Sequence, residues 1–453
     1  MSRDAIIRIT AKPRGFILSP GFSVLIILLS SFFLLSGYVF EGVCVLALMG
    51  GAVLMFTADN IPFLQVLLAA SALVIRLKNT ATDFFKVWPI IFPLIIFLII
   101  RLILYPVKLK KTGVFYGMLA VSFALIAGGI GFISPQEYFK PESIFHIIML
   151  GAGMLLLTSY FAGSLNEETT EKFDERFSRI MISLIVIIFV SLLAEYIPRF
   201  EEFRREMSVI PFQWRNNGST LLMLAMPFPF YIASKRFGYF FFGLLCYISI
   251  LFTGSRGGLL FGTLEFGICI VAMLIIDRRH RKIYGIMVGI FAVILVLMSK
   301  YMYELLSNTI ERFMDPSENS IRLGLLQRGL YDFIKHPVFG TGIGYMGNRD
   351  IHRSAKYALC WYHCSVVQVP ASMGVAGILA YLFLNIQRIK VFIKNISLFN
   401  ITLFISFIGL EMMSLVNPGL FAPVPYLLMI SLYFPIMESV KQNTVLQNKE
   451  ETQ

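Results

Sequence analysis

The sequence predicts an all-α, polytopic integral membrane protein with about 14 transmembrane helices (12 to 14) and one long external loop that contains a helix. Two observations predict this class. First, 57% of the 453 residues are hydrophobic and only 15% are charged, whereas soluble domains usually carry roughly 25% charged residues. Second, the apolar residues gather in runs such as 22–35, 89–103 and 180–193, and a helix needs about 20 apolar residues to cross a bilayer. A disordered chain, a secreted disulfide scaffold and an ordinary soluble enzyme are therefore excluded.

The apolar runs define the expected helices in chain order. The predicted spans are 17–37, 39–58, 61–75, 88–105, 114–133, 143–163, 179–197, 218–234, 237–253, 257–276, 283–304, 363–386, 399–416 and 421–438. The expected organisation is N-terminal transmembrane helices in residues 1–304, an external loop in 305–362, and C-terminal transmembrane helices with a tail in 363–453.

Basic clusters between the runs predict the orientation. Clusters near 108–111, 235–236, 278–282 and 388–394 should be cytoplasmic, because short cytoplasmic loops are enriched in Lys and Arg. This pattern accounts for the formal net charge of +12 without nucleic acid as a partner. Both termini are then expected in the cytoplasm, and the loops after residues 134, 198, 254, 305 and 417 on the outside.

One basic group does not fit this orientation. Successive spans cross the membrane in opposite directions, so the connection after the third span is expected on the outer side. This connection contains Arg76, Lys78 and Lys86. Either the third span does not cross fully, or this loop is an exception to the rule.

The long connection 305–362 should contain a helix near 319–334. Leu323, Leu326, Leu330 and Phe333 recur at spacings of three and four, the period of one helix face. His336-Pro337 should end this helix, which is expected to pack over the outer membrane surface. The glycines at 342, 344 and 347 match a dinucleotide fingerprint in spacing only, because no strand precedes them.

Arginines at predicted external positions are candidate anion ligands. Arg256 lies in a turn with Ser255, Gly257 and Gly258, where the lack of side-chain bulk permits close approach to a ligand. A guanidinium offers a planar fork to phosphate oxygens. A membrane-boundary arginine can also be a snorkelling anchor, and that alternative stays open here.

Three further external arginines carry the same two interpretations, anion ligand or solvated charge. Arg322 and Arg328 lie on the predicted loop helix, and Arg322 is in its first turn, where free backbone N–H groups attract anions. Arg215 comes just before a predicted span.

His363 is the candidate general base among the five histidines. It lies where the long loop re-enters the membrane, and an imidazole titrates near neutral pH. Cys360 and Cys364 flank it at a spacing of four. Since no further ligand pair accompanies them, no metal is expected, and no cofactor either.

Taken in order, these motifs resemble the O-antigen ligase and polymerase family of bacterial polysaccharide assembly. The matching residues are 253–257, Arg322 followed by His336-Pro337 and the glycines at 340, 342 and 344, and His363 followed by Gln368 and the glycines at 374 and 377. The resemblance covers roughly residues 210–385. Two positions depart from the family pattern: Cys364 stands where Asn usually follows the histidine, and Leu325-Leu326 stand where an aromatic is usual.

The resemblance implies metal-independent, inverting glycosyl transfer outside the bacterial cytoplasmic (inner) membrane. The donor would be a glycan on undecaprenyl diphosphate. The acceptor would be a sugar hydroxyl on lipid A core, on another lipid-linked unit or on a cell-wall polymer. Arg256 and Arg322 would bind the diphosphate and His363 would act as base, all three in one external cavity. Arg215, Arg328 and Ser255 would be accessory residues.

The other partners expected are membrane lipids and, for a polymerase, a chain-length regulator. Ligase and polymerase are not separated by the sequence. The alternatives from other classes are a flippase for lipid-linked oligosaccharides, another polysaccharide transporter, and a non-catalytic scaffold.

Overall fold

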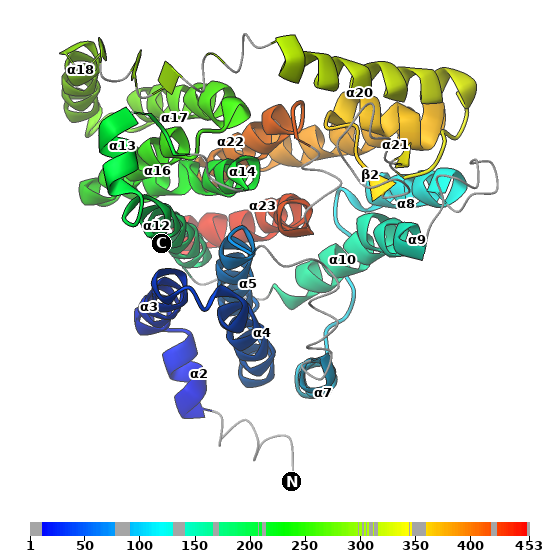
Figure 1. Ribbon diagram of the computed structural model, residues 1–453. Coiled ribbons are helices and arrows are strands. Elements are labelled where there is room, and N and C mark those ends of the chain that lie inside the picture. The colour runs from blue at the N-terminus through cyan, green and yellow to red at the C-terminus, as the bar shows by residue number, and fades with distance from the viewer. Residues whose placement is uncertain are drawn as a thin grey trace. The chain divides into compact units, whose positions relative to one another are not determined.

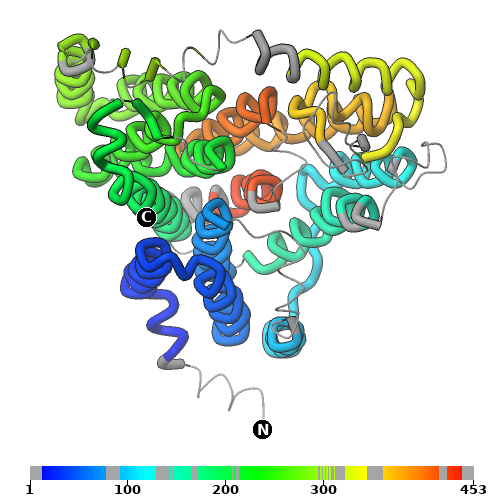
Figure 2. Tube along the Cα trace, viewed as in Figure 1, coloured from blue at the N-terminus to red at the C-terminus, as the bar shows by residue number. Residues whose placement is uncertain are grey.

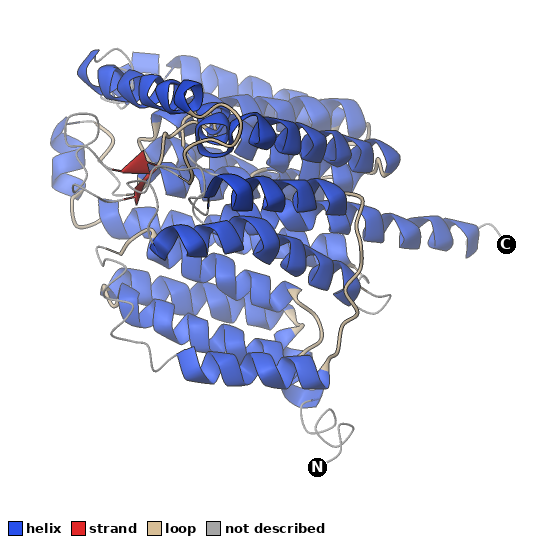
Figure 3. Ribbon diagram, turned by 90° about the vertical axis from the view of Figure 1, so that its right-hand side faces the viewer, coloured by secondary structure: helices blue, strands red, loops and turns tan. Residues whose placement is uncertain are grey.

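The structure, a computed structural model, is built almost entirely of helices in the residues it describes (Figures 1 and 3). These residues are 11–77, 91–129, 141–165, 172–206, 208–210, 214–297, 316–343, 345–346, 359–417 and 424–450, with single or paired residues between 299 and 311. One antiparallel strand pair, β1 (Tyr345–Met346) with β2 (Leu359–Cys360), interrupts this pattern. The predicted all-α class is confirmed.

The chain forms two compact units that are interleaved in sequence. The first consists of Met1–Lys108 and Asn166–Thr309, and the second of Leu109–Leu165 and Ile310–Gln453. The first unit contains α2 (Ala11–Ile17), α3 (Pro20–Ser36), α4 (Val39–Phe56), α5 (Ile61–Val74), α7 (Ile91–Leu104), α12 (Phe173–Tyr196), α13 (Phe200–Glu206), α14 (Arg215–Ala225), α15 (Pro227–Ala233), η4 (Phe237–Tyr239), α16 (Phe240–Phe252), η5 (Gly258–Gly262), α17 (Thr263–Ile276) and α18 (Arg281–Leu297). The second contains α8 (Phe115–Gly129), α9 (Pro141–Ile148), η3 (Met149–Gly153), α10 (Met154–Ser164), α20 (Pro316–Lys335), β1, β2, α21 (Ser365–Lys394), α22 (Leu398–Met413) and α23 (Val424–Glu450).

Helix boundaries follow local sequence signals. Pro20 and Pro62 lie in the first turns of α3 and α5, where the missing N–H costs nothing. Gly37 ends α3 with a φ of 82°, a left-handed conformation that glycine adopts without strain. Helix therefore covers each apolar run that the sequence predicted as a span.

Several of these helices have the composition of membrane spans. Among the described residues, five are long and apolar enough to cross a membrane: Val39–Phe56, His146–Ser164, Phe173–Tyr196, Gly258–Ile276 and Ser365–Lys394. Seven further apolar helices are shorter, at 10–17 residues. The predicted count of about 14 crossings stays a prediction.

In the first unit, α5 and α12 run parallel from one end to the other. The contacts along them keep the same order in both helices: Asp59 with Arg176, Gln65 with Ser183, and Arg76 with Glu195. The blue α5 and the green α12 can be followed in Figure 2. This arrangement favours a third span that runs its full length. The charge of Arg76 is balanced by Glu195, while Lys78 and Lys86 lie outside the described residues.

In the second unit, α8 packs against α21, which is broken in its middle. Gly374 has a φ of 63° and a ψ of −155° inside α21. Val375 and Ala376 therefore donate their N–H groups to Pro337 and Val338 rather than to the preceding turn. In return, the carbonyls of Ala371 and Ser372 accept from Thr341 and Gly342, at 2.8 and 3.2 Å. The segment 337–342 thus replaces the hydrogen bonds that the break removes.

Glycines allow this close approach. A Cβ atom on Gly340 would lie 2.4 Å from the backbone N of Met373, and one on Gly374 would lie 2.4 Å from the carbonyl C of Val338. On α8, a Cβ on Gly128 would lie 2.3 Å from the carbonyl O of Phe339. The glycine-rich stretch after His336-Pro337 is therefore explained by packing against α21.

The loop helix is α20, but it packs through a different face from the predicted one. Leu323 and Leu330 are 55% and 50% exposed, whereas Leu325 is 2% exposed and packs with Tyr362. Gly329 lies against α21, where an added Cβ would be 2.2 Å from Val367 Cγ1. Of the predicted stripe, Leu326 packs against the same buried cluster as Leu325, whereas Leu323 and Leu330 do not.

Candidate functional site

The turn after α16 holds the first group of candidate residues. α16 ends where Gly254 adopts a φ of 64°. The Ser255 hydroxyl donates to Asn216 Oδ1 at 2.8 Å and accepts from the Gly258 N–H at 3.1 Å. Ser255 is 1% exposed and Arg256 is 9% exposed. Arg256 is thus a nearly buried cation at the start of a helix, held by a turn that is fixed to α14.

This turn is tied to α14 by close packing as well as by the hydrogen bond. A Cβ on Gly258 would lie 2.6 Å from Ser219 Cβ on α14, so only glycine fits there. Arg215, an accessory candidate, is the first residue of α14 and precedes Asn216. Ser255, Arg256 and Arg215 therefore come from two segments in direct contact.

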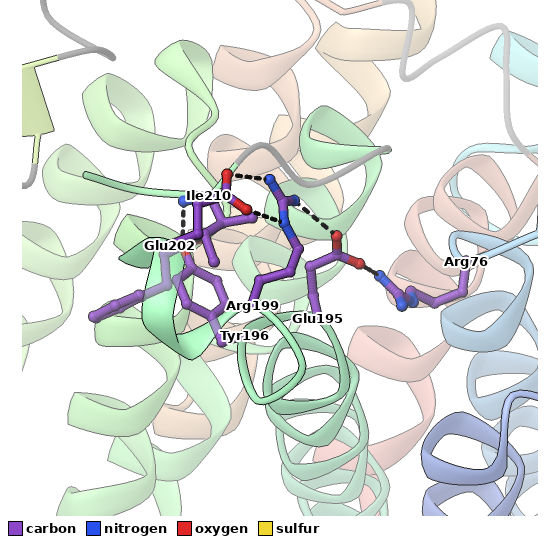
Figure 4. Close-up of polar contacts among 7 residues, drawn as sticks. Arg76, Glu195, Tyr196, Arg199, Glu202 and Ile210 are labelled. Carbon is purple, nitrogen blue, oxygen red and sulfur yellow. Dashed lines mark hydrogen bonds and ion pairs between the residues drawn. The ribbon is translucent and has the colours of Figure 1, made fainter. Parts of the chain in front are cut away.

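Tyr196 joins the same turn to the end of α12. Its hydroxyl donates to the Phe252 carbonyl at 3.0 Å and accepts from the Ile210 N–H at 3.1 Å. Beside it, Glu195 binds Arg76 and Arg199, and Arg199 also binds Glu202 (Figure 4). The hydrogen bonds with Arg199 lower the pKa of Glu202, and those with Glu202 raise the pKa of Arg199. This ion-pair chain fixes the end of the unit on which the Arg256 turn lies.

The second group surrounds the junction of α20 and α21. Asp332, 1% exposed, accepts from Arg328 Nε at 3.1 Å and from the Tyr362 hydroxyl at 2.7 Å. The Tyr362 N–H donates to Gln368 Oε1 at 2.9 Å, and Gln368 donates to Ser372 at 2.8 Å. Burial, and then the charge of Asp332, raise the pKa of Tyr362 well above its ordinary value, so its hydroxyl remains a donor.

His363 follows directly after this network and has unusual backbone geometry. Its φ is 57°, a left-handed conformation that is uncommon for any residue except glycine. Such conformations cost about 1–3 kcal/mol and occur preferentially at functional sites. Tyr362 on one side and the start of α21 at Ser365 on the other hold His363 in this conformation; the Ser365 N–H donates to the Ser414 carbonyl at 2.9 Å.

The predicted site residues divide between the two compact units. Arg256, Ser255 and Arg215 belong to the first unit; Arg322, Arg328 and His363 belong to the second. Arg322 is half-buried on α20, and Arg328 is the ion-pair partner of Asp332. The convergence of Arg256 with Arg322 and His363 stays a prediction.

Sequence reasoning missed three residues that organise these sites. Asn216 and Tyr196 hold the first site, and Asp332 holds the second. Only Asp332 had a local signal, its spacing of four from Arg328. In the described part of the chain, no three His, Cys, Asp or Glu side chains are grouped as metal ligands.

Comparison with known proteins identifies one matching family. Residues 240–382 match a family model described as O-antigen ligase. This stretch includes the Arg256 turn, α20 with Arg322, and His363 with the broken helix. A search of curated proteins gives no match.

Proposed function

We propose that this chain is a membrane glycosyltransferase, because residues 240–382 match a family model described as O-antigen ligase. It transfers a glycan from undecaprenyl diphosphate to a sugar hydroxyl on the outer side of the cytoplasmic membrane. The observation that carries this proposal is the left-handed backbone of His363 next to a buried Tyr362–Asp332 pair. A conformation with this cost needs a reason, and positioning an imidazole for catalysis supplies one.

In the proposed reaction, the imidazole of His363 takes the proton of the acceptor hydroxyl. The acceptor oxygen forms a bond to the anomeric carbon while the bond from that carbon to the diphosphate oxygen breaks, with inversion. The electron pair of the broken bond leaves with the undecaprenyl diphosphate. No metal or cofactor takes part, since the diphosphate is already a good leaving group.

Arg256 and Arg322 bind the diphosphate in this proposal. Negative charge builds up on the bridging oxygen as the bond breaks, and a guanidinium already in place stabilises it without reorganisation. The near burial of Arg256 supports this role, because electrostatic attraction is stronger where water is excluded. Ser255 in the same turn and Arg215 on the adjoining helix α14 are accessory residues. Arg328 contributes through its ion pair with Asp332.

The test is transfer from a purified lipid-linked donor in proteoliposomes. His363→Ala should lower the rate by ~10²–10⁴-fold while donor binding stays largely intact. Arg256→Lys keeps the charge but loses the planar fork, and it should lose ~10²–10³-fold. His280→Ala is the matched control, because His280 binds Asp277 on the other compact unit. Full activity of His363→Ala would remove the base assignment.

The metal-free chemistry is tested in the same assay. Transfer should persist in the presence of EDTA. Loss of activity that added metal restores would contradict the proposal, and it would make Cys360, His363 and Cys364 candidate ligands.

A transporter of lipid-linked oligosaccharides is the second candidate. Arg388 on α21, 4% exposed, lies 3.5 Å from Glu411 on α22, and α21 is broken at Gly374. Buried charges and discontinuous helices occur in transporters. Two results together would favour this alternative. The donor would cross the proteoliposome membrane in the absence of acceptor, and no glycan transfer would occur when acceptor is present.

A further inference from the structure

A pocket with an excess of positive charge lies at the other end of the first unit from the Arg256 turn. Its walls come from α2, α3, α5 and α12, and its polar lining consists of Ser19, Ser23, Gln65, Arg176 and Arg179. The remaining lining residues are apolar. The pocket has a volume of about 300 Å³ including its open mouth, and its enclosed part has room for only a few heavy atoms.

The two arginines differ in how their charge is balanced. Arg176 forms an ion pair with Asp59. The guanidinium of Arg179, one turn further along α12, makes no hydrogen bond or ion pair with any residue that the structure describes. Like charges one helical turn apart repel each other. Among the residues that the structure describes, Arg179 therefore adds a positive charge to the pocket that no ion pair balances.

The position of the pocket along α12 separates it from the proposed catalytic residues. Arg179 and Tyr196 are 17 positions apart on one helix, which is about 26 Å at 1.5 Å per residue, and Tyr196 contacts Phe252 beside the Arg256 turn. This separation is close to the thickness of a hydrocarbon core, roughly 30 Å. Lys235, which binds Asp174 at 2.8 Å, lies at the same end of α12 as the pocket.

An apolar strip on α3 begins beside the pocket. Val24, Leu28 and Phe32 recur every four residues and are 54%, 63% and 60% exposed. Val24 is adjacent to Ser23, which lines the pocket. A ligand with a charged head in the pocket could therefore lay an acyl chain along this strip, which a soluble anion cannot do.

We propose that this pocket binds the phosphate of an anionic phospholipid from the leaflet opposite the Arg256 turn. Arg179 donates the N–H groups of its planar guanidinium to the phosphate oxygens, and the acyl chains follow α3. The hydroxyls of Ser19 and Ser23 already donate to the Phe16 carbonyl and to Gln65 Oε1, so the arginine is the donor that binds the ligand. The enclosed part is too small for a sugar chain. The site is independent of glycosyl transfer.

The experiment is a binding titration of the purified full chain in detergent, followed by native mass spectrometry. The probes are dioleoyl phosphatidylglycerol, dioleoylglycerol with the same chains but no phosphate, and inorganic phosphate as competitor. We expect phosphatidylglycerol to bind and dioleoylglycerol not to bind. Arg179→Gln should weaken phosphatidylglycerol binding by about tenfold or more, because hydrogen bonds to a charged group are among the stronger ones.

Arg204→Gln is the matched control, since it removes the same charge from α13 at the opposite end of α12. Its affinity for phosphatidylglycerol should equal that of the wild type. Arg179→Lys keeps the charge without the fork and should bind with intermediate affinity; it also tests the site if the glutamine variant does not fold.

Three results would overturn the proposal. One is an unchanged affinity in both Arg179 variants. Another is an equal loss in Arg204→Gln, which would show a non-specific charge effect. The third is complete displacement of the lipid by inorganic phosphate at equal concentration, which would assign the pocket to a soluble anion.

Discussion

At the scale of single residues, Asp332 is a buried carboxylate beside the segment that carries the candidate base. It accepts hydrogen bonds from Arg328 on its own helix and from Tyr362, the residue before His363. A buried carboxylate that loses one of its donors costs about 1–3 kcal/mol. We therefore expect Asp332 and Tyr362 to position His363.

Tyr362→Phe should lower the rate of transfer while donor binding changes little, because only the orientation of His363 is affected. It should also lower the free energy of unfolding by about 1–3 kcal/mol. The measurements are kcat and KM in proteoliposomes and thermal unfolding in detergent. Tyr331→Phe is the control, since Tyr331 is 56% exposed on α20, next to Asp332. A change in KM alone would contradict a positioning role.

Asp277, in the connection between α17 and α18, should make the protein sensitive to acid. Burial raises the pKa of this carboxyl, but hydrogen bonds from His280 and Tyr284 together lower it below its ordinary value of 3.8. A carboxylate whose pKa is lower in the folded protein than in the unfolded chain stabilises the fold at pH values above the pKa of the unfolded chain. That contribution is lost as the pH falls through the folded pKa.

We therefore expect the unfolding temperature of the wild type to decrease when the pH is lowered past about 4. The decrease should be smaller in Asp277→Asn. Thermal unfolding in detergent between neutral and acid pH measures this. Glu201→Gln is the control, because it removes an exposed carboxylate on α13. Its unfolding temperature should depend on pH as that of the wild type does. Identical profiles for the wild type and Asp277→Asn would show that another group is responsible.

At the scale of elements, helix positions could be predicted and helix contacts could not. The sequence predicts a helix near 319–334 and the structure has one at Pro316–Lys335, because a period of apolar residues and a following proline are local signals. The buried face of α20 instead depends on Gly329 and Asp332. The sequence likewise predicts one continuous span after His363, since the break at Gly374 depends on partners more than 30 residues away.

Gly374→Ala should destabilise the second unit strongly. The conformation of Gly374, with a φ of 63° and a ψ of −155°, is essentially restricted to glycine, and alanine there costs about 1–3 kcal/mol in backbone strain. Its Cβ would also collide with Val338. Gly267→Ala on α17, where no atom lies within 4 Å of an added Cβ, should be neutral or slightly stabilising. Thermal unfolding of the two variants compares them directly. Equal unfolding temperatures for the two variants would mean that the break in α21 at Gly374 is not required for a stable fold.

At the scale of the whole molecule, the all-helical class could be predicted from composition. The resemblance to O-antigen ligases could be predicted from ordered motifs, and residues 240–382 match that family model. It did not predict the two interleaved units, in which residues 109–165 group with the C-terminal part of the chain. The Arg76–Glu195 pair shows the reason: contacts between distant segments leave no local pattern. The proposed mechanism requires that Arg256 of one unit and Arg322 of the other bind one diphosphate.

Double-mutant cycles test this requirement. If both guanidinium groups bind the same diphosphate, the effects of Arg256→Lys and Arg322→Lys on kcat/KM should not add, with a coupling of about 0.5–3 kcal/mol. Combining Arg256→Lys with Arg204→Lys should be additive within about 0.5 kcal/mol, because Arg204 is an exposed arginine paired with Glu201. Additivity in the Arg256–Arg322 cycle would mean that the two arginines act at separate places. The prediction that both arginines bind one diphosphate would then be wrong, even if each arginine is needed for activity.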